Sequence, residues 1–443
     1  MTRRHASTSV WLITAFSMLA LAHSAGAQRN AATRDTLRLG DLQTEAVQRD
    51  PRARQLDLLA TQSSLREGDV SATRLPTIGA NAQGQYQSQV VTIPLQLPNG
   101  ISVPVPSHDS YDAYLTAQQP LYDPSVSARR GVERAQLAVS QAAVRSSLFT
   151  LRQNVNDAYF AALMEQVQSE EQQSAITDLE AHRDVAVNRV KQGAALPSEA
   201  EMLEAELLRR KQAVDALDAG RAAALAVLAN LTGRPVGQTD ALAPPDLAAA
   251  VAQARRSIDT LSARPEYEQF ARNRDLLAEQ QASLGAADRP RVSAFGRAGY
   301  GRPGLNPLSQ DFQSYWLAGV KVDWTPWNWG TTRRDQEALT VQKQIVETDA
   351  AAFRKGVERG VTQELANIDQ LEHTLAGDDT IIALREHILR ETDIRFREGV
   401  ITSAEYVDRE TDLLNARLAR VSHRVQLAQA RANFLTFLGL GVR

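Results

Sequence analysis

Hydrophobic residues recur along this chain with two different periods, and each period predicts a different kind of element. Over 125–232 and 330–438, apolar residues return every three or four positions, which predicts amphipathic helices. The stretch 132–192 contains neither glycine nor proline, and a helix over it would extend ~90 Å. A helix of that length does not fit inside a compact core, so the pattern favours a coiled coil or a helical barrel.

Each of these long segments contains one predicted turn, so each is predicted to be a helical hairpin. The turns are placed near 193–197, between Gly193 and Pro197, and near 399–402, after Gly399. Further helices are predicted over 36–73, with Thr36 as the N-cap, and over 262–287. A connector is predicted over 234–261. Three glycines predict local bends in the second long helix: Gly356, Gly360 and Gly377.

Four shorter stretches alternate apolar and polar residues with a period of two, which predicts strands near 78–90, 110–122, 290–301 and 312–325. In the last stretch Trp316, Val320 and Trp324 share one side. Alternation with aromatic residues near the ends is typical of outer-membrane strands, although a soluble sheet with one wet face alternates identically. We interpret the aromatic residues as a membrane-interface girdle rather than a ligand pocket: Tyr86, Tyr111, Tyr300, Trp316, Trp324 and Trp327.

A segment of about twenty residues occurs twice, half a chain apart. A shift of 206 positions superposes Arg189 on Arg395, Gly193 on Gly399 and Glu199 on Glu405. The same shift carries Gly233 onto Gly439 without a gap. The chain is therefore predicted to contain two copies of one unit, at 28–233 and 262–443.

The first 27 residues have the features of a signal peptide. Arg3 and Arg4 precede an apolar run over 10–22, and Ala25-Gly26-Ala27 fits a cleavage site. The alternative, a membrane anchor, is disfavoured because the apolar run is short. We expect an exported protein whose mature chain begins at Gln28. Since the chain has no cysteine, neither disulfides nor lipidation at an N-terminal cysteine is expected.

Composition argues against several classes of function. With 49 Lys and Arg against 52 Asp and Glu, no basic surface for nucleic acid is indicated. No phosphate-binding loop and no zinc-protease motif occurs, and the seven histidines are scattered. We therefore expect no enzyme, no metal site and no cofactor.

Four strands are too few to close a membrane barrel, since the smallest known barrels have about eight. The chain is therefore expected to oligomerise. Three copies related by cyclic symmetry would supply twelve strands, and their hairpins would continue the barrel as a ring of helices. The predicted fold class is a membrane α+β protein with two repeats in each protomer.

This order of elements resembles the outer-membrane efflux protein family typified by TolC, over essentially the whole mature chain. The most specific features are the turns at Gly193 and Gly399, followed by Glu199 and by Glu405 with Asp408. A second marker is the end of each strand pair, at 119–123 (Gln-Pro-Leu-Tyr-Asp) and 325–330 (Thr-Pro-Trp-Asn-Trp-Gly). The resemblance implies a passive trimeric duct of an efflux or type I secretion system. Its partners would be a periplasmic adaptor, an inner-membrane pump of the RND or ABC type, and outer-membrane lipid.

The resemblance also implies roles for the two turns, which would lie at the periplasmic tips of the duct. Glu405 and Asp408, with Glu199, are candidates for a gate, because rings of carboxylates in a narrow opening attract cations. The alternative is that these are solvated acids near a helix N-terminus, where the dipole favours them. The candidate adaptor contacts are the residues of the turns themselves, which could equally serve local packing: Gly193, Leu196, Gly399, Val400 and Ile401.

One departure from the family pattern concerns the closed state. Similar proteins hold the tips together with polar bridges from a tyrosine and an arginine, where this chain has Phe396 and Ile401. Apolar contacts or other pairs are expected to replace those bridges.

Two other classes of protein carry long helices of this kind. A periplasmic adaptor has one hairpin flanked by compact β-domains, whereas this chain has two hairpins and widely spaced strand pairs. A structural coiled-coil protein of the envelope would not need four amphipathic strands with aromatic ends. Both remain alternatives to the duct.

Overall fold

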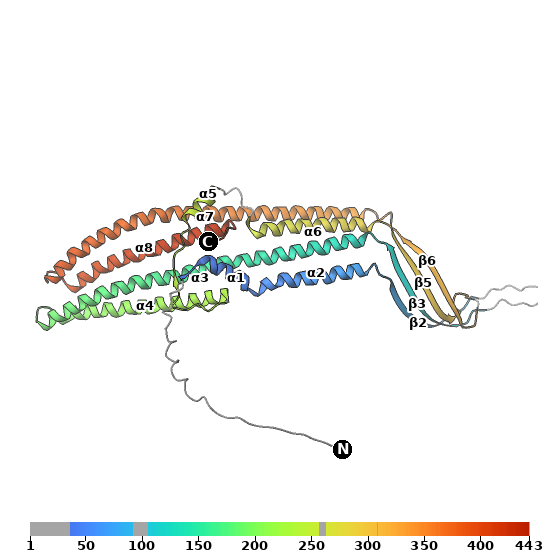
Figure 1. Cartoon of the computed structure of the whole chain (residues 1–443), viewed down its shortest axis with the longest axis horizontal. Helices are drawn as coiled ribbons and strands as arrows, with labels where there is room; N and C mark the ends of the chain where they lie inside the picture. The colour runs from blue at the N-terminus through green and yellow to red at the C-terminus, as the bar shows by residue number, and fades with distance from the viewer. Residues whose placement is uncertain (1–35, 92–104, 257–262, 308, 443) are drawn as a thin grey trace, which may run out of the picture.

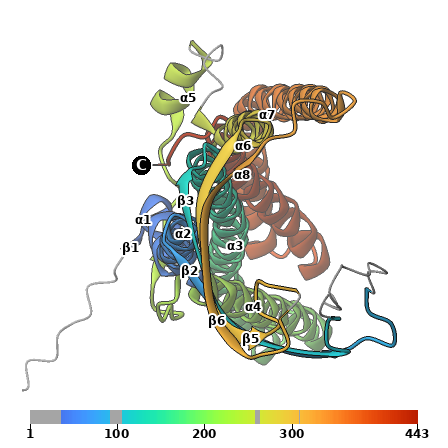
Figure 2. The ribbon, with the colours of Figure 1, turned by 90° about the vertical axis from the view of Figure 1, so that its right-hand side faces the viewer.

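The computed structural model describes residues 36–91, 105–256, 263–307 and 309–442. The predicted signal peptide, 1–27, lies outside the described residues, as do 257–262 in the predicted connector. The described chain is elongated, with two helical hairpins lying side by side and a small sheet at one end (Figure 1). In the end-on view the sheet is a curved strip in front of the helices (Figure 2).

The first hairpin consists of α3 (Ser125–Lys191) and α4 (Pro197–Thr232), and the second of α7 (Thr331–Arg397) and α8 (Ser403–Phe437). Helices α3 and α7 each have 67 residues, which gives them a length of ~100 Å. Among the described residues, no helix is both long enough and apolar enough to cross a membrane.

Helix α7 runs through all three of its glycines without interruption. At Gly360 the reason for a glycine is close packing, because a Cβ there would lie 2.8 Å from the ring of Phe437 on α8. The two helices of the second hairpin can therefore approach each other closely at this level.

The predicted single helix over 36–73 is wrong. This region contains the strand β1 (Thr36–Leu37), α1 (Leu39–Arg49), the 3-10 helix η1 (Pro51–Arg54) and α2 (Gln55–Ala72). Asp50 is extended, and its carboxylate accepts a hydrogen bond from the Arg52 backbone N–H at 2.8 Å. Proline has no N–H to continue the helical ladder, so the chain breaks there and restarts as α2. Thr36 lies in a strand and is no N-cap.

The largest hydrophobic core lies at mid-length, where the hairpins meet the terminal segments. Strand β1 pairs in parallel with β4 (Ala241–Leu242), which is followed by α5 (Ala248–Arg255). The hydroxyl of Tyr159 on α3 lies 3.0 Å from the Leu37 carbonyl and 2.7 Å from that of Ala243. Burial raises the pKa of Tyr159 to about 12, so the hydroxyl stays protonated. Helix α6 (Pro265–Ala287) packs along α3 and α7.

The sheet at the end of the molecule joins both halves of the chain. Its strands are β2 (Thr77–Tyr86), β3 (Asp109–Tyr122), β5 (Arg291–Arg302) and β6 (Gln313–Asp323), in that order and antiparallel throughout. The register aligns Ala80, Leu115, Ala298 and Trp316 in one row across the four strands. Because side chains alternate along a strand, the apolar positions of all four strands share one face.

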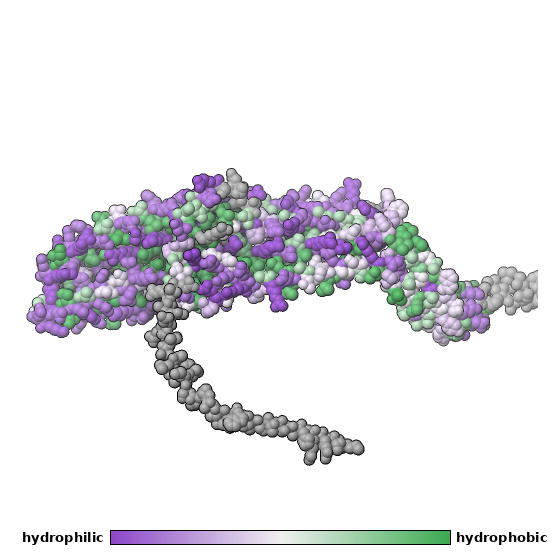
Figure 3. Space-filling model, viewed as in Figure 1, coloured by the Kyte–Doolittle hydropathy of each residue, from purple (hydrophilic) through white to green (hydrophobic). Residues whose placement is uncertain are grey.

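The opposite face of the sheet carries polar and aromatic groups. There the Tyr315 hydroxyl donates to Asp112 at 2.6 Å, and Arg297 forms an ion pair with the same carboxylate. The Arg297 guanidinium also lies 3.4 Å from the centre of the Tyr114 ring. Figure 3 shows hydrophobic surface gathered on the sheet near its junction with the helices. The sheet is thus amphipathic as a whole, with one apolar and one polar side.

Candidate functional site

The two hairpin turns lie next to each other at the end of the molecule remote from the sheet (Figure 1). In the first turn the Ala194 N–H donates to the Arg189 carbonyl at 2.8 Å, and the Gly193 N–H donates to that of Val190 at 3.0 Å. Gly193 has a φ of 73°, which allows this helix end because glycine has no Cβ to clash. Pro197 then begins α4.

The second turn repeats this geometry. Gly399 has a φ of 77°, and the Val400 N–H donates to the Arg395 carbonyl at 2.9 Å. Four of the five predicted adaptor contacts are exposed: Gly193, Leu196, Gly399 and Val400. Ile401 differs, because it is half-buried and packs on the apolar cluster inside the tip. It therefore contributes to local packing as well as to the turn.

The apolar cluster inside the tip joins both hairpins. It contains Ile176, Leu179, Ala186, Leu203, Leu207, Phe396 and Tyr406. Phe396 is fully buried and stacks on Tyr406 with ring centres 5.0 Å apart. Phe396 is therefore a core residue, and it stabilises the tip by apolar contact.

A polar bridge joins the two tips through a residue to which the sequence analysis gave no role. Arg189, at the end of α3, donates from Nη1 to the Phe396 carbonyl at 2.8 Å. Its guanidinium lies directly over Gly399, where any side chain would overlap with it. In the sequence, only the match between Arg189 and Arg395 in the repeat indicated that Arg189 has a role.

The predicted gate acids are divided between the two hairpins. Glu405 and Asp408 are exposed on α8. Glu405 lies in the first turn of that helix, and its backbone N–H donates to the Thr402 hydroxyl at 3.3 Å. Glu199 on α4 is half-buried and accepts a hydrogen bond from the Ser403 hydroxyl at 3.5 Å. Among the described residues, no group of three or more His, Asp or Glu side chains is placed to hold a metal ion.

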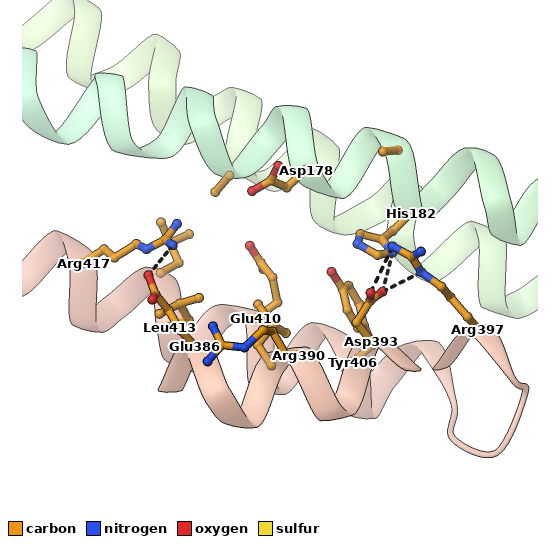
Figure 4. Close-up of a pocket in the computed structure, with 14 residues that line it drawn as sticks. Asp178, His182, Glu386, Arg390, Asp393, Arg397, Tyr406, Glu410, Leu413 and Arg417 are labelled. Atoms are coloured by element: carbon orange, nitrogen blue, oxygen red, sulfur yellow. Dashed lines mark hydrogen bonds and ion pairs between the residues drawn. The ribbon is translucent and has the colours of Figure 1, made fainter. Parts of the chain in front are cut away.

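A groove of about 590 Å³ runs between α3 on one side and α7 and α8 on the other (Figure 4). His182 of α3 lies across it, with Nδ1 3.6 Å from the Asp393 carboxylate of α7. Arg397 pairs with the same carboxylate at 3.0 Å. Burial lowers the pKa of His182, and Asp393 partly opposes this effect. The groove is thus lined by apolar side chains and by charged groups, several of which pair with one another.

Behind the groove lies a buried ion pair that joins α4 to α8. Arg210 donates to both carboxylate oxygens of Glu410, from Nη1 at 2.7 Å, and its Nε donates to Glu206 at 2.8 Å. The Arg210 and Glu410 side chains are only 1% and 7% exposed. Under the shift of 206 positions, Glu410 corresponds to Glu204. However, Glu204 pairs with Arg183 in a more exposed position, so the repeat did not indicate this contact.

The predicted girdle residues are all exposed, and they lie on the sheet or directly beside it: Tyr86, Tyr111, Tyr300, Trp316, Trp324 and Trp327. The Trp324 indole N–H donates to the Asp288 carbonyl at 3.1 Å, at the end of the sheet nearest the helices. Tyr86, Tyr111 and Tyr300 lie toward the opposite end, as the register shows. Aromatic side chains thus occur at both ends of the strands, whereas Trp316 lies between the ends, in the same row as Leu115.

This chain is similar to known proteins in sequence over part of its length and in fold over most of its length. No family model matches the chain. The probable efflux pump outer membrane protein TtgC and the antibiotic efflux pump outer membrane protein ArpC, both of Pseudomonas putida, are each 23% identical over 189 residues. That match spans 41% of this chain and 38% of the length of each relative.

Solved structures match over nearly the whole chain. CusC aligns with a TM-score of 0.67 and 15% identity, over 91% of this chain and 92% of that one. The MtrE outer membrane channel of Neisseria gonorrhoeae, in its open state, aligns with a TM-score of 0.64 and 20% identity, over 92% and 90%. The outer membrane protein VceC of Vibrio cholerae aligns with a TM-score of 0.64 and 14% identity, over 91% of this chain and 97% of that one. The fold is shared with these three proteins, and the predicted resemblance to outer-membrane efflux proteins is confirmed.

Proposed function

We propose that this chain, which resembles outer-membrane efflux proteins in sequence and fold, is the outer-membrane channel of a tripartite efflux or type I secretion system. The observation that carries the proposal is the amphipathic sheet. All four strands turn their apolar positions to one side, and the two halves of the chain contribute two strands each. Such a sheet fits a wall with lipid on one side and water on the other.

The edges of this sheet support assembly into a closed ring. Strands β2 and β6 each pair on one side only among the described residues, and open strand edges need a partner. Joining β6 of one copy to β2 of the next would close a barrel, and three copies would supply twelve strands. The paired hairpins would continue as a helical barrel into the periplasm. The aromatic residues at the two ends of the strands would then lie at the two membrane interfaces.

The tips of the hairpins are the proposed meeting point with partners. Leu196 and Val400 are 67% and 69% exposed although apolar, which suits contact with a periplasmic adaptor that links the channel to an inner-membrane pump. Gly193 and Gly399 hold the turns that present them. We propose Glu405 and Asp408 as a cation-sensitive ring at the opening, and Glu199 as a positioning residue that holds Ser403.

Fractionation of cells that express the full chain tests this function. We expect the protein in the outer-membrane fraction, without its first 27 residues and as a trimer in mild detergent. Recovery as a soluble periplasmic monomer would overturn the proposal and favour an adaptor or a coiled-coil protein of the envelope. An added test is loss of drug or solute export on deletion, with no change in the amount of pump.

A further inference from the structure

The apolar face of the sheet is hollowed near the end of the strands that is remote from the helices (Figure 1). The hollow measures about 430 Å³, and its floor is formed by small residues, Ala82 and Gly84 of β2 and Ala113 of β3. Gly84 lies opposite Tyr111 in the register, and a Cβ at Gly84 would lie 3.3 Å from the Tyr111 ring. The small floor residues therefore leave space beside a large ring.

Three aromatic side chains form the wall of this space, which we call the aromatic hollow: Tyr111, Tyr300 and Phe312. Phe312 directly precedes β6, and its ring stacks on both tyrosines, with ring centres 6.3 Å from Tyr111 and 5.6 Å from Tyr300. About half of each side chain is nevertheless exposed. The rings thus hold one another in place while they offer apolar surface to another molecule.

A charged pair lies beside the aromatic hollow. Arg302 of β5 is opposite Tyr111 in the register and forms an ion pair with Asp109 of β3. The Arg302 guanidinium lies 5.7 Å from the centre of the Tyr111 ring and 5.4 Å from that of Phe312. Arginine has five N–H donors, and Asp109 accepts from Nη2. The same guanidinium can therefore bind a second anion.

The position of these groups determines which molecule they would meet. Side chains alternate along a strand, so Arg302 and Tyr111 lie on the same face as Leu115 and Trp316. In the proposed channel that face contacts lipid, and the end remote from the helices lies in the outer leaflet. The outer leaflet contains acylated disaccharides that carry phosphate groups. A phosphate is complementary in charge to Arg302, and basic residues at a membrane surface bind such headgroups.

We propose that the aromatic hollow and the pair of Arg302 and Asp109 bind lipopolysaccharide from the outer leaflet. Arg302 would donate to a phosphate of the lipid A headgroup, and Asp109 would accept a hydrogen bond from a sugar hydroxyl. An acyl chain would occupy the hollow above Ala113. The proposal rests on the outer-membrane channel proposed above, and it adds a lipid ligand of defined chemistry to that channel.

The test of the charged pair is lipid binding by the full-length protein, purified from outer membranes in mild detergent. Native mass spectrometry compares lipopolysaccharide, phosphatidylglycerol and phosphatidylethanolamine as added probes. We expect the wild type to prefer lipopolysaccharide, and Arg302→Gln to weaken that binding about tenfold, because a charge-assisted hydrogen bond is lost.

Asp109→Asn separates binding from a structural role of the ion pair. The asparagine keeps an acceptor but removes the negative charge that competes for Arg302. We therefore expect Asp109→Asn to bind lipopolysaccharide at least as tightly as the wild type does. If the pair only stabilised the sheet, Arg302→Gln and Asp109→Asn would weaken binding alike, and that result would overturn the site.

The hollow is tested by Ala113→Leu, which fills the floor. Its matched control is Ala117→Leu, on the same strand and the same face but closer to the helices and outside the lining of the hollow. Ala113→Leu should weaken lipopolysaccharide binding about tenfold, as expected when about two CH₂ groups of an acyl chain are no longer buried. Ala117→Leu should bind normally.

Two results separate this site from the channel itself. A trimer in the outer membrane that binds phosphatidylglycerol as tightly as lipopolysaccharide, or that is unaffected by Arg302→Gln and Ala113→Leu, overturns the glycolipid site and leaves the channel intact. A soluble monomer overturns both.

Discussion

Arg210 on α4 and Glu410 on α8 form a buried, bidentate ion pair that ties the two hairpins together close to their tips. Replacing Arg210 by alanine is expected to destabilise the folded state by about 3–5 kcal/mol, because the Glu410 carboxylate would remain buried without its partner. Thermal unfolding of the purified protein in detergent, followed by the helical circular dichroism signal, measures the effect. The double variant Arg210→Met/Glu410→Leu should recover most of the loss.

Arg209 provides the matched control for this prediction. It neighbours Arg210 and pairs with the same Glu206, but its side chain is 63% exposed. Arg209→Ala should change stability by no more than about 1 kcal/mol, as is usual for exposed pairs. Equal losses for Arg209→Ala and Arg210→Ala would contradict the view that burial makes this pair important.

The bridge from Arg189 to the Phe396 carbonyl predicts an effect on opening. Arg189→Ala removes this polar contact between the two tips of one chain. The variant is expected to raise the conductance of single channels in planar bilayers. Lys191→Ala, an exposed neighbour in the same last turn, serves as the control and should leave conductance unchanged. Wild-type conductance in Arg189→Ala would show that the bridge does not hold the tips.

His182 predicts that the tip loses stability on acidification. It faces Asp393 and Arg397 of α7, Tyr406 of α8 and Asp178 of its own helix. Burial lowers its pKa in the folded state, while in the unfolded chain it titrates near about 6.5. Below that pH the unfolded chain binds a proton that the folded tip does not take up. Stability is therefore full above about pH 6.5 and decreases as pH falls toward the lowered value.

The measurement is the melting temperature as a function of pH between neutral and mildly acidic conditions. His182→Asn should flatten the slope in that window. His387→Asn is the control, since its ring on α7 is 65% exposed and should leave the slope unchanged. A slope that survives in His182→Asn would assign the dependence to other groups.

The proposed gate predicts a change in cation block. Replacing both Glu405 and Asp408 by alanine should weaken the block of single-channel current by divalent cations, because the proposed carboxylate ring would be lost. Glu398→Ala, exposed in the same tip, is the control. If block is the same in the double variant and the wild type, these acids are only solvated charges at the start of α8.

The amphipathic sheet predicts that the two faces of β3 respond differently to charge. Leu115 belongs to the apolar row, whereas Gln118 lies on the opposite face. Leu115→Lys should reduce the amount of trimer in the outer membrane, because a lysine facing lipid near mid-membrane costs about 2–4 kcal/mol. Gln118→Lys should assemble normally. Normal assembly of both variants would argue against lipid on the Leu115 side.

The sequence predicted elements well where one period dominates over a long stretch. The strand pattern around Trp316 and the helical pattern around Tyr159 both reflect side chains that face one environment throughout. The break at Asp50 and Pro51 was missed, because the apolar spacing on either side continues as if the helix were unbroken. Local proline chemistry overrode the longer pattern there.

The contacts of the tip were harder to predict because they depend on which helix faces meet. Nothing in the spacing around Arg210 indicates that its partner lies 200 positions away on α8. The acids chosen from the turn, Glu405 and Asp408, proved exposed. The buried acid Glu410, two residues beyond Asp408, was given no role from the sequence. Burial distinguishes these acids, and burial is a property of the packed hairpins.

The core around Tyr159 lies near the middle of α3, so a rotation of the helices about this core would move both ends of the molecule. Tyr159 lies about as far along α3 from Ser125, near the sheet, as from Gln192 at the tip, which is ~50 Å in each direction. With an arm of that length, a tilt of about 5° at the core displaces the tip by ~4 Å. The hydrogen bonds of Tyr159 to Leu37 and Ala243 hold the pivot. A small rotation there would move the tips by about the width of a side chain.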